Sequence, residues 1–156
     1  MGDNKDKILI VVAARKNSKG LKNKNIKQLC GKPLISFTIR QAGKWGKADH
    51  IICSTASREI ARIAKPYGAE IPFMRPSGLS RDSVAKMDVI RHALLICERI
   101  YKKVFNIVVD LDVTSPVRKV ADLDKCLRLF RKNRPNVIFS VVKSRKNPYF
   151  NMVEMG

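Results

Sequence analysis

Short, uninterrupted apolar runs along the chain predict buried strands. The run at residues 8–14 shows no alternation with polar positions, as is typical of a central strand that is covered on both faces in a parallel sheet. Residues 104–109 form a second run of this kind. Pro72 lacks a backbone N–H and would place a strand around it at a sheet edge. Shorter apolar stretches predict further strands at 51–53, 70–74 and 137–142, and 148–156 looks like the start of another.

Segments with apolar residues at helical spacing separate these strands. The first helix begins at Pro33, whose fixed φ suits the start of a helix. A shorter helix spans about 60–67, with Gly68 placed to cap its end. Longer amphipathic helices are predicted over about 83–100 and 122–131. Because strands and helices alternate, the chain is predicted to have an α/β fold with a mostly parallel sheet.

The length of 156 residues allows one domain with a full core, so we predict a single domain over 1–156. No apolar run approaches the roughly 20 residues needed to cross a bilayer. The polar amino terminus lacks the apolar segment of a signal peptide. We therefore expect a cytoplasmic protein without a membrane segment. Since the last predicted strand stops without a closing element, we interpret the chain as truncated at its C-terminal end.

The composition is strongly basic, with 32 Lys and Arg against 13 Asp and Glu and a net charge of +19. Such a field attracts polyanions, which include nucleic acid, nucleoside triphosphates and acidic lipid. A solvated basic surface would have the same composition. Charge therefore does not choose among these alternatives.

Cysteine and histidine offer little chemistry in this sequence. The cysteines are widely spaced and form no Cys-x-x-Cys pair, so we expect free, buried thiols rather than a metal or redox site. Neither His50 nor His92 is expected to have a chemical role. The four cysteines are Cys30, Cys53, Cys97 and Cys126.

The loop predicted over 15–31 follows the first strand, where ligands collect in open α/β sheets. Its first part contains five cations, three short neutral polar residues and Gly20, which permits a sharp turn and a close approach of the backbone. A triphosphate prefers such a mixture of fixed positive charge and short donors. The loop has neither the Gly-x-Gly-x-x-Gly spacing nor a P-loop. By composition alone, a basic flexible loop and a phosphate-binding loop remain equally open.

The order of residues in this region resembles the opening of the acylneuraminate cytidylyltransferases, which include the synthetases of CMP-sialic, CMP-legionaminic and CMP-pseudaminic acid. The resemblance rests first on Ala-Arg-x-x-Ser-Lys-Gly-Leu-x-x-Lys-Asn at 14–25 and on Leu-Cys-Gly-Lys-Pro-Leu-Ile at 29–35. It continues through nearly the whole chain, with Ile-Cys-Ser-Thr at 52–55, Tyr-Gly-Ala-Glu at 67–70, Arg-Pro at 75–76, Leu-Ser-Arg-Asp at 79–82 and Thr-Ser-Pro-Val-Arg at 114–118. The segments 110–112 and 145–151 look most like the synthetases for CMP-legionaminic acid and related bacterial sugars.

The resemblance implies a three-layer α/β/α, Rossmann-like nucleotide-diphospho-sugar transferase fold. It implies transfer of CMP from CTP to a nine-carbon acidic sugar, with release of pyrophosphate, in the modification of flagellin or surface polysaccharide. The sugar's anomeric hydroxyl would attack the α-phosphorus, and the protein would align the groups and spread the developing charge. Arg15 and Lys24 are the predicted catalytic residues. Ser18 and Lys19 would join them at the phosphates, with Gly20 in the same loop and Asn25 near the ribose, whereas Lys16 and Lys22 are expected to be solvated.

Further binding residues are implied along the chain. Arg75 matches a family arginine close to the cytosine end of the nucleotide. Ser80, Asp82 and Lys86 belong to a segment that closes over the base. Many relatives have a small polar residue in place of Lys86, whose charge would meet a phosphate or the sugar carboxylate instead. Arg118 is a candidate for substrate contact.

Asp110 and Asp112 end a buried strand, where carboxylates are costly unless they are paired or bound to metal. Many sialic acid synthetases have Gln in place of Asp112, facing the acceptor sugar. An aspartate there would recognise a different sugar or bind Mg²⁺ together with Asp110, and a turn-capping role is an equal alternative. The family's main metal-binding aspartates and its dimer-forming arm are expected beyond residue 156. We therefore expect the chain alone to be inactive, and the full-length protein to be a homodimer.

The sequence leaves two other functions open. One is a related sugar nucleotidyltransferase, such as a CMP-Kdo synthetase. The other is a basic nucleic-acid-binding module, supported by the net charge of +19 and a calculated isoelectric point of 10.2. Aromatic residues make up only 6% of the chain and no stacking motif or zinc spacing is present, which argues against nucleic acid as the partner.

Overall fold

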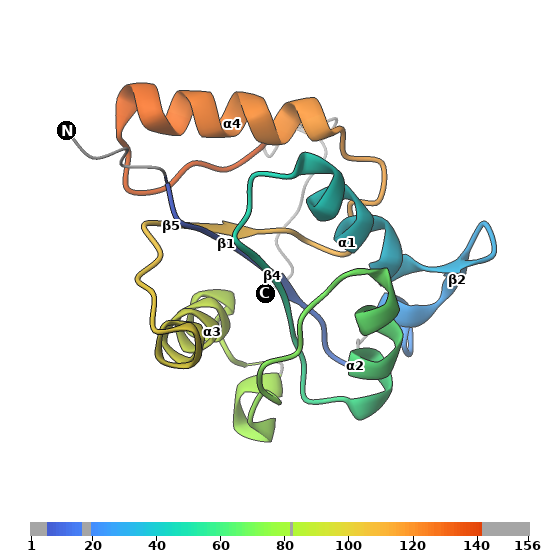
Figure 1. Cartoon of the computed structure of the whole chain (residues 1–156). Helices are drawn as coiled ribbons and strands as arrows, with labels where there is room; N and C mark the ends of the chain where they lie inside the picture. The colour runs from blue at the N-terminus through green and yellow to red at the C-terminus, as the bar shows by residue number, and fades with distance from the viewer. Residues whose placement is uncertain (1–5, 17–19, 82, 142–156) are drawn as a thin grey trace, which may run out of the picture. The chain divides into compact units, whose positions relative to one another are not determined.

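The computed structural model describes residues 6–16, 20–81 and 83–141 (Figure 1). The chain groups into two units, 1–120 and 121–156. The single domain expected over 1–156 stays a prediction.

A three-stranded parallel sheet forms the centre of the first unit. Strand β1 (Ile8–Ala13) lies between β4 (His50–Ser54) and β5 (Ile107–Asp110). In the register, Ala13 is level with Ser54 and Val11 with Asp110, so the three strands end at one edge of the sheet. The strands predicted at 8–14 and 51–53 and the parallel sheet are confirmed, and the strand predicted at 104–109 begins only at Ile107.

Helices cover both faces of this sheet. Figure 1 shows α1 (Leu34–Trp45) and α3 (Lys86–Tyr101) on opposite faces, and both helices contact β1. Side chains alternate along a strand, so β1 can contribute to two apolar layers at once. This explains why its apolar run shows no alternation with polar residues. The predicted three-layer α/β/α architecture is confirmed in the first unit.

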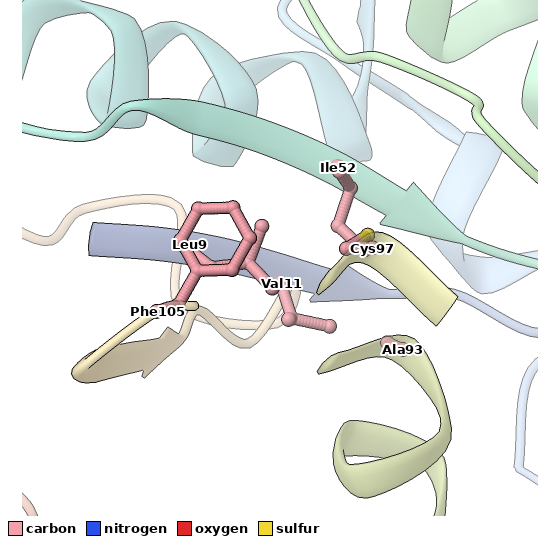
Figure 2. Close-up of a cluster of buried hydrophobic side chains, with 6 residues drawn as sticks. All are labelled: Leu9, Val11, Ile52, Ala93, Cys97 and Phe105. Atoms are coloured by element: carbon pink, nitrogen blue, oxygen red, sulfur yellow. The ribbon is translucent and has the colours of Figure 1, made fainter. Parts of the chain in front are cut away.

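The layer toward α3 is the hydrophobic cluster in Figure 2. Leu9 and Val11 of β1 pack there with Ala93 and Cys97 of α3, and all four side chains are fully buried. Removing a buried side chain of this kind typically costs about 2–5 kcal/mol, because a cavity remains. The cluster is completed by Ile52 and Phe105.

The segment after β4 contains the predicted short helix. Helix α2 (Arg58–Ala64) begins after Ser57, whose Oγ accepts the backbone N–H of Ile60 at 3.4 Å. A 3₁₀ turn, η2 (Lys65–Tyr67), follows and ends at Gly68, whose φ of 104° is left-handed. Gly68 thus has the capping role predicted from the sequence. A second 3₁₀ turn, η3 (Ser77–Ser80), lies farther along.

The predicted edge strand at 70–74 is wrong. Only Glu70 pairs with the sheet, in an isolated parallel bridge to Ile52. Pro72 has no N–H to donate, and the pairing does not continue past it. Helix α3 begins at Lys86, later than the predicted residue 83.

The loop predicted over 15–31 contains more structure than its composition indicates. A 3₁₀ turn, η1 (Lys24–Ile26), is followed by the antiparallel hairpin of β2 (Gln28–Leu29) and β3 (Lys32–Pro33). Cys30 and Gly31 form its two-residue turn with φ of 48° and 73°. Positive φ at both positions is the geometry that tight hairpins prefer. Cys30 is exposed there, so the expectation of a buried thiol is wrong for this cysteine, whereas Cys53 and Cys97 are buried.

The second unit contains helix α4 (Val120–Asn133), except for Val120, which is the last residue of the first unit. This helix includes the one predicted over about 122–131. The strand predicted over 137–142 is absent from 137–141. The side chains of Val137, Phe139 and Val141 are exposed, and these residues pair with no strand in the described part of the chain. Apolar character alone does not make a strand, because its backbone needs a neighbour to hydrogen-bond. The strand expected at 148–156 lies outside the described residues.

Candidate active site

The carboxyl ends of β1, β4 and β5 carry most of the predicted site residues. The chain passes from β1 to β4 on one side and reaches β5 on the other, so the strand order reverses at β1. In open α/β sheets, ligands bind at the carboxyl ends of the strands beside such a reversal. Arg15 follows β1 by two residues, Thr55 directly follows β4, and Asp110 ends β5. The topology thus brings together residues that are far apart in the sequence.

Arg75 is the most deeply buried charged residue of this edge, with 5% of its surface exposed. Its guanidinium donates hydrogen bonds to the carbonyl of Ala14 at 3.2 Å and to Oγ of Ser80 at 3.1 Å. Its backbone N–H donates to the carbonyl of Thr55 at 2.9 Å. Arg75 therefore joins the end of β1, the end of β4 and the η3 turn. Of the segment predicted to close over the base, Ser80 contacts Arg75, and Asp82 lies outside the described residues.

In the described part of the chain, the guanidinium of Arg75 donates hydrogen bonds to neutral acceptors and pairs with no carboxylate. Burial lowers the pKa of Arg75, and repulsion from the nearby Arg15 acts in the same direction. A buried guanidinium beside a second one is costly unless an anion approaches. The arrangement therefore favours a negatively charged ligand at the end of β1.

Arg15 is half-buried, and the loop that carries it is closed by Asn25. Nδ2 of Asn25 donates to the carbonyl of Arg15 at 2.8 Å, and Asn25 is 6% exposed. Lys24, also half-buried, begins the η1 turn directly after Asn23, whose φ of 57° is left-handed. Asn25 was expected near the ribose, and the structure shows in addition that it positions Arg15. Ser18 and Lys19 lie outside the described residues.

Two other residues of this loop, Lys16 and Gly20, are exposed. For Gly20, a Cβ added to the backbone would meet no atom within 4 Å. The protein's own packing therefore does not require glycine at this position. Lys16 is solvent-exposed, as expected, and its ammonium pairs with Glu59 of α2 at 3.4 Å, with both side chains about half exposed. Such a surface pair stabilises a fold by about 0–1 kcal/mol.

A second group of charges lies at the end of β5. Nζ of Lys86 is 2.5 Å from Oδ2 of Asp110 and 3.4 Å from Oδ2 of Asp112. Oδ1 of Asp112 accepts the backbone N–H of Thr114 at 3.0 Å and its hydroxyl at 2.8 Å. Asp112 therefore also has the turn-capping role considered from the sequence. Oδ1 of Asp110 is buried and has no hydrogen-bond partner in the part of the chain that the structure describes.

Burial and pairing shift the pKa values of these groups. Burial raises the pKa of Asp110, although Lys86 opposes this effect. Burial also acts to raise the pKa of Asp112, but the bonds from Thr114 and the charge of Lys86 together lower it. Burial acts to lower the pKa of Lys86, and the two carboxylates outweigh it and raise that pKa. The ammonium form of Lys86 is thus favoured at neutral pH.

Helix α1 holds the loop that follows β5. Nε2 of Gln41 donates to the carbonyls of Pro116 and Arg118 at 2.6 and 2.9 Å, and Thr38 donates to the carbonyl of Asp112 at 3.3 Å. The guanidinium of Arg118 donates back to Oε1 of Gln41 at 3.3 Å and to the carbonyl of Asp112 at 3.0 Å. Arg118 therefore shapes the loop.

Sequence reasoning missed the positioning roles of Thr38 and Gln41. Their spacing of three residues on α1 places both on one helix face, which is the signal that could have found them. The main-chain carbonyl of Ala14, which accepts from Arg75, left no sequence signal at all.

The described residues contain no group of three or more His, Cys, Asp and Glu side chains that could hold a metal ion. Mg²⁺ needs only one or two carboxylates, because water and phosphate oxygens complete its shell. The unpartnered Oδ1 of Asp110 fits this requirement, and Asp112 would be the second ligand.

Comparisons with known proteins define the class. The family model for cytidylyltransferases matches residues 9–152. The chain is 41% identical over 148 residues to the CMP-N,N'-diacetyllegionaminic acid synthase of Campylobacter jejuni and, over the same length, to the post-translational flagellin modification protein B of Campylobacter coli. Each match covers 95% of this chain and 63% of the relative. The fold is similar to that of a CMP:2-keto-3-deoxy-manno-octonic acid synthetase complexed with CTP, with a TM-score of 0.66, 20% identity, and coverage of 83% of this chain and 49% of the other.

The chain therefore belongs to the cytidylyltransferase family, as the resemblance implied. The two Campylobacter relatives are named for flagellin modification and for CMP-N,N'-diacetyllegionaminic acid synthesis. The chain spans less than two thirds of the length of these relatives. In the part of the chain that the structure describes, no helix is both long enough and apolar enough to cross a membrane.

Proposed function

We propose that this protein contributes to the transfer of CMP from CTP to a nine-carbon acidic sugar, with release of pyrophosphate. The buried, positively charged end of β1 carries the proposal. Arg75 lies there without a carboxylate partner among the described residues, next to Arg15. Two guanidinium groups in a poorly hydrated place favour a polyanion such as a triphosphate.

In the proposed reaction, the anomeric hydroxyl oxygen of the sugar forms a bond to the α-phosphorus of CTP. The bond from that phosphorus to the bridging oxygen breaks, pyrophosphate leaves with the electron pair, and the proton of the attacking hydroxyl passes to solvent. Arg15 and Lys24 would hold the phosphates and spread the developing charge. Asn25 would keep Arg15 in position through the hydrogen bond that it donates to the main-chain carbonyl of Arg15. Arg75 would place the cytosine end through its links to Ser80 and Thr55.

Asp110 and Asp112 are the residues proposed to hold Mg²⁺ at the end of β5. A bound Mg²⁺ would neutralise phosphate charge and make the α-phosphorus more electrophilic. Oδ1 of Asp110 supports this role because it is buried and no described residue donates a hydrogen bond to it. Asp112 would also contribute to recognition of the sugar. The 41% identity to the Campylobacter jejuni CMP-N,N'-diacetyllegionaminic acid synthase, against 31% to its pseudaminic acid cytidylyltransferase, favours a legionaminic-type sugar.

Three narrower statements stay predictions. The first is a cytoplasmic location, and the second is a homodimer of the full-length protein. The third is that the 156-residue chain alone does not turn over substrate. A pyrophosphate-release assay on the purified chain, with CTP, sugar and Mg²⁺, tests the third directly.

Calorimetric titration with CTP, UTP, ATP and GTP, at near-physiological salt and with Mg²⁺, tests the proposal. We expect CTP to bind at least about tenfold more tightly than the other three nucleotides, a difference of about 1.4 kcal/mol. Arg15→Met should weaken CTP binding, whereas Arg62→Met, which removes an exposed arginine of α2, should not.

Equal, weak binding of all four nucleotides would contradict the proposed choice of base. Selective CTP binding followed by activity with a Kdo-type sugar alone would favour a CMP-Kdo synthetase. Tight binding of single-stranded RNA that falls steeply with salt would favour the nucleic-acid-binding module.

A further inference from the structure

Lys86 occupies an unusual position for a cation. It is the first residue of α3, where the partial positive charge of a helix N-terminus disfavours a second positive charge. Its ammonium nevertheless lies against the carboxylates of Asp110 and Asp112, at 2.5 and 3.4 Å. The two carboxylates at the end of β5 therefore offset the unfavourable position of Lys86.

The same two carboxylates have one free coordination position. Thr114 satisfies Oδ1 of Asp112, and Lys86 contacts Oδ2 of both aspartates. Among the described residues, Oδ1 of Asp110 is the one oxygen of the two carboxylates without a hydrogen-bond partner, and it is shielded from solvent. A divalent cation that used this oxygen would meet the ammonium of Lys86 on the other oxygen of the same carboxylate. Two cations in one such site repel each other strongly.

We propose that Lys86 is a resident counter-ion that competes with a divalent cation for Asp110 and Asp112. The cation enters only when the ammonium group moves away. Lysine suits this role because its charge sits at the end of a flexible four-carbon stem, and this side chain is 47% exposed. This role for Lys86 rests on the proposed function only in taking Mg²⁺ or a similar ion as the cofactor.

Direct metal binding tests the competition. Mn²⁺ serves as the probe, with free Mn²⁺ followed by its electron paramagnetic resonance signal, on the 156-residue chain without nucleotide. Lys86→Met should lower the dissociation constant for Mn²⁺ by about tenfold, because removing the charged hydrogen-bond partner frees the carboxylates. Lys86→Arg keeps the charge and should bind Mn²⁺ about as weakly as the unmodified chain. Asp110→Asn in the Lys86→Met background should abolish the gain.

A matched control separates competition from a general change of charge. Lys44→Met removes an exposed lysine near the end of α1 and changes the net charge by the same amount. It should leave Mn²⁺ binding unchanged within about twofold. Circular dichroism of each variant confirms that it is folded, and Lys86→Gln replaces Lys86→Met if the latter does not fold.

Several outcomes would overturn the role of Lys86. They are equal Mn²⁺ affinity in the Lys86→Met and Lys44→Met variants, weaker binding in Lys86→Met, or no binding of Mn²⁺ by any variant. Failure of the proposed function would look different, since it would appear as loss of CTP selectivity in the calorimetric titration. Selective CTP binding with unchanged Mn²⁺ affinity would therefore reject the counter-ion role alone.

Discussion

The side-chain amide of Asn25 donates a hydrogen bond of 2.8 Å to the main-chain carbonyl of Arg15. The two residues are ten positions apart, and the bond closes the loop that follows β1. Asn25 is 6% exposed, so water is a poor substitute for this bond. The path of the main chain at Arg15, just after β1, therefore depends on a donor from the η1 turn.

Asn25→Asp should destabilise the protein more than a change of this size normally does. An ionised carboxylate has no donor and would place its oxygen against the carbonyl oxygen of Arg15. We expect the free energy of unfolding at neutral pH, measured with urea, to fall by about 1–3 kcal/mol or more. Asn106→Asp is the matched control, because Asn106 uses its oxygen to accept the N–H of Lys7 at 2.7 Å and an aspartate can still do so. Equal losses in both variants would contradict the role given to Asn25.

Arg75→Lys should weaken both stability and nucleotide binding. A single ammonium cannot reproduce the planar guanidinium that reaches the carbonyl of Ala14 and the hydroxyl of Ser80 together. We expect a loss of about 1–3 kcal/mol in urea unfolding and weaker CTP binding in calorimetry. Arg62→Lys, an exposed position on α2, should change neither quantity. Unaltered CTP affinity in Arg75→Lys would mean that Arg75 supports the fold only.

Gln41→Met should loosen the loop that follows β5. Methionine has a similar length but makes none of the bonds to Pro116 and Arg118. We expect faster amide hydrogen exchange in residues 113–118 and a loss of about 1–3 kcal/mol in unfolding free energy. Gln28→Met in the exposed strand β2 is the control and should leave exchange in this loop unchanged. Unchanged exchange in Gln41→Met would show that other contacts hold the loop.

Acid should destabilise the protein in part through Asp49. This carboxylate accepts the backbone N–H of Ile8 at 2.7 Å and pairs with Lys103. The hydrogen bond from Lys103 lowers the pKa of Asp49 below its ordinary value, although burial opposes it. The unfolded chain therefore binds this proton more tightly than the folded one. The resulting stability is fully present above the unfolded pKa of about 3.9 and is lost as pH falls through the folded value.

Asp49→Asn tests this pH dependence. The variant should be less stable than the unmodified chain at pH 7, because Lys103 loses its charged partner. The difference in unfolding free energy, measured with urea at a series of pH values, should shrink as the pH falls below about 4. A difference that stays constant from pH 7 to pH 3 would show that the ion pair does not carry the effect.

Local sequence patterns were sufficient to predict several helices and strands. The apolar run at 8–14 predicted β1, and helical spacing after Pro33 predicted α1. Gly68 was correctly expected to cap a helix, because only a left-handed residue ends it in this way. These features follow from side-chain periodicity and from backbone sterics, which a single sequence contains.

The wrong predictions concern elements that need a partner. Residues 70–74 and 137–141 have the apolar character of strands, but pairing in the sheet ends at Glu70 and no described strand lies beside 137–141. The hairpin of β2 and β3 was missed for the opposite reason. Its strands are two residues long, and its turn depends on a positive φ at Cys30, which is uncommon outside glycine and asparagine.

The sequence by itself determined the α/β class, the family resemblance and the residue types that collect at the carboxyl end of the sheet. Only the tertiary structure decided which of these residues touch. It buried Arg75 against the carbonyl of Ala14, 61 positions away, and set Lys86 between Asp110 and Asp112. The physical reason is that strand order and helix packing set distances between distant residues, and a main-chain carbonyl that accepts a hydrogen bond leaves no signature in the sequence.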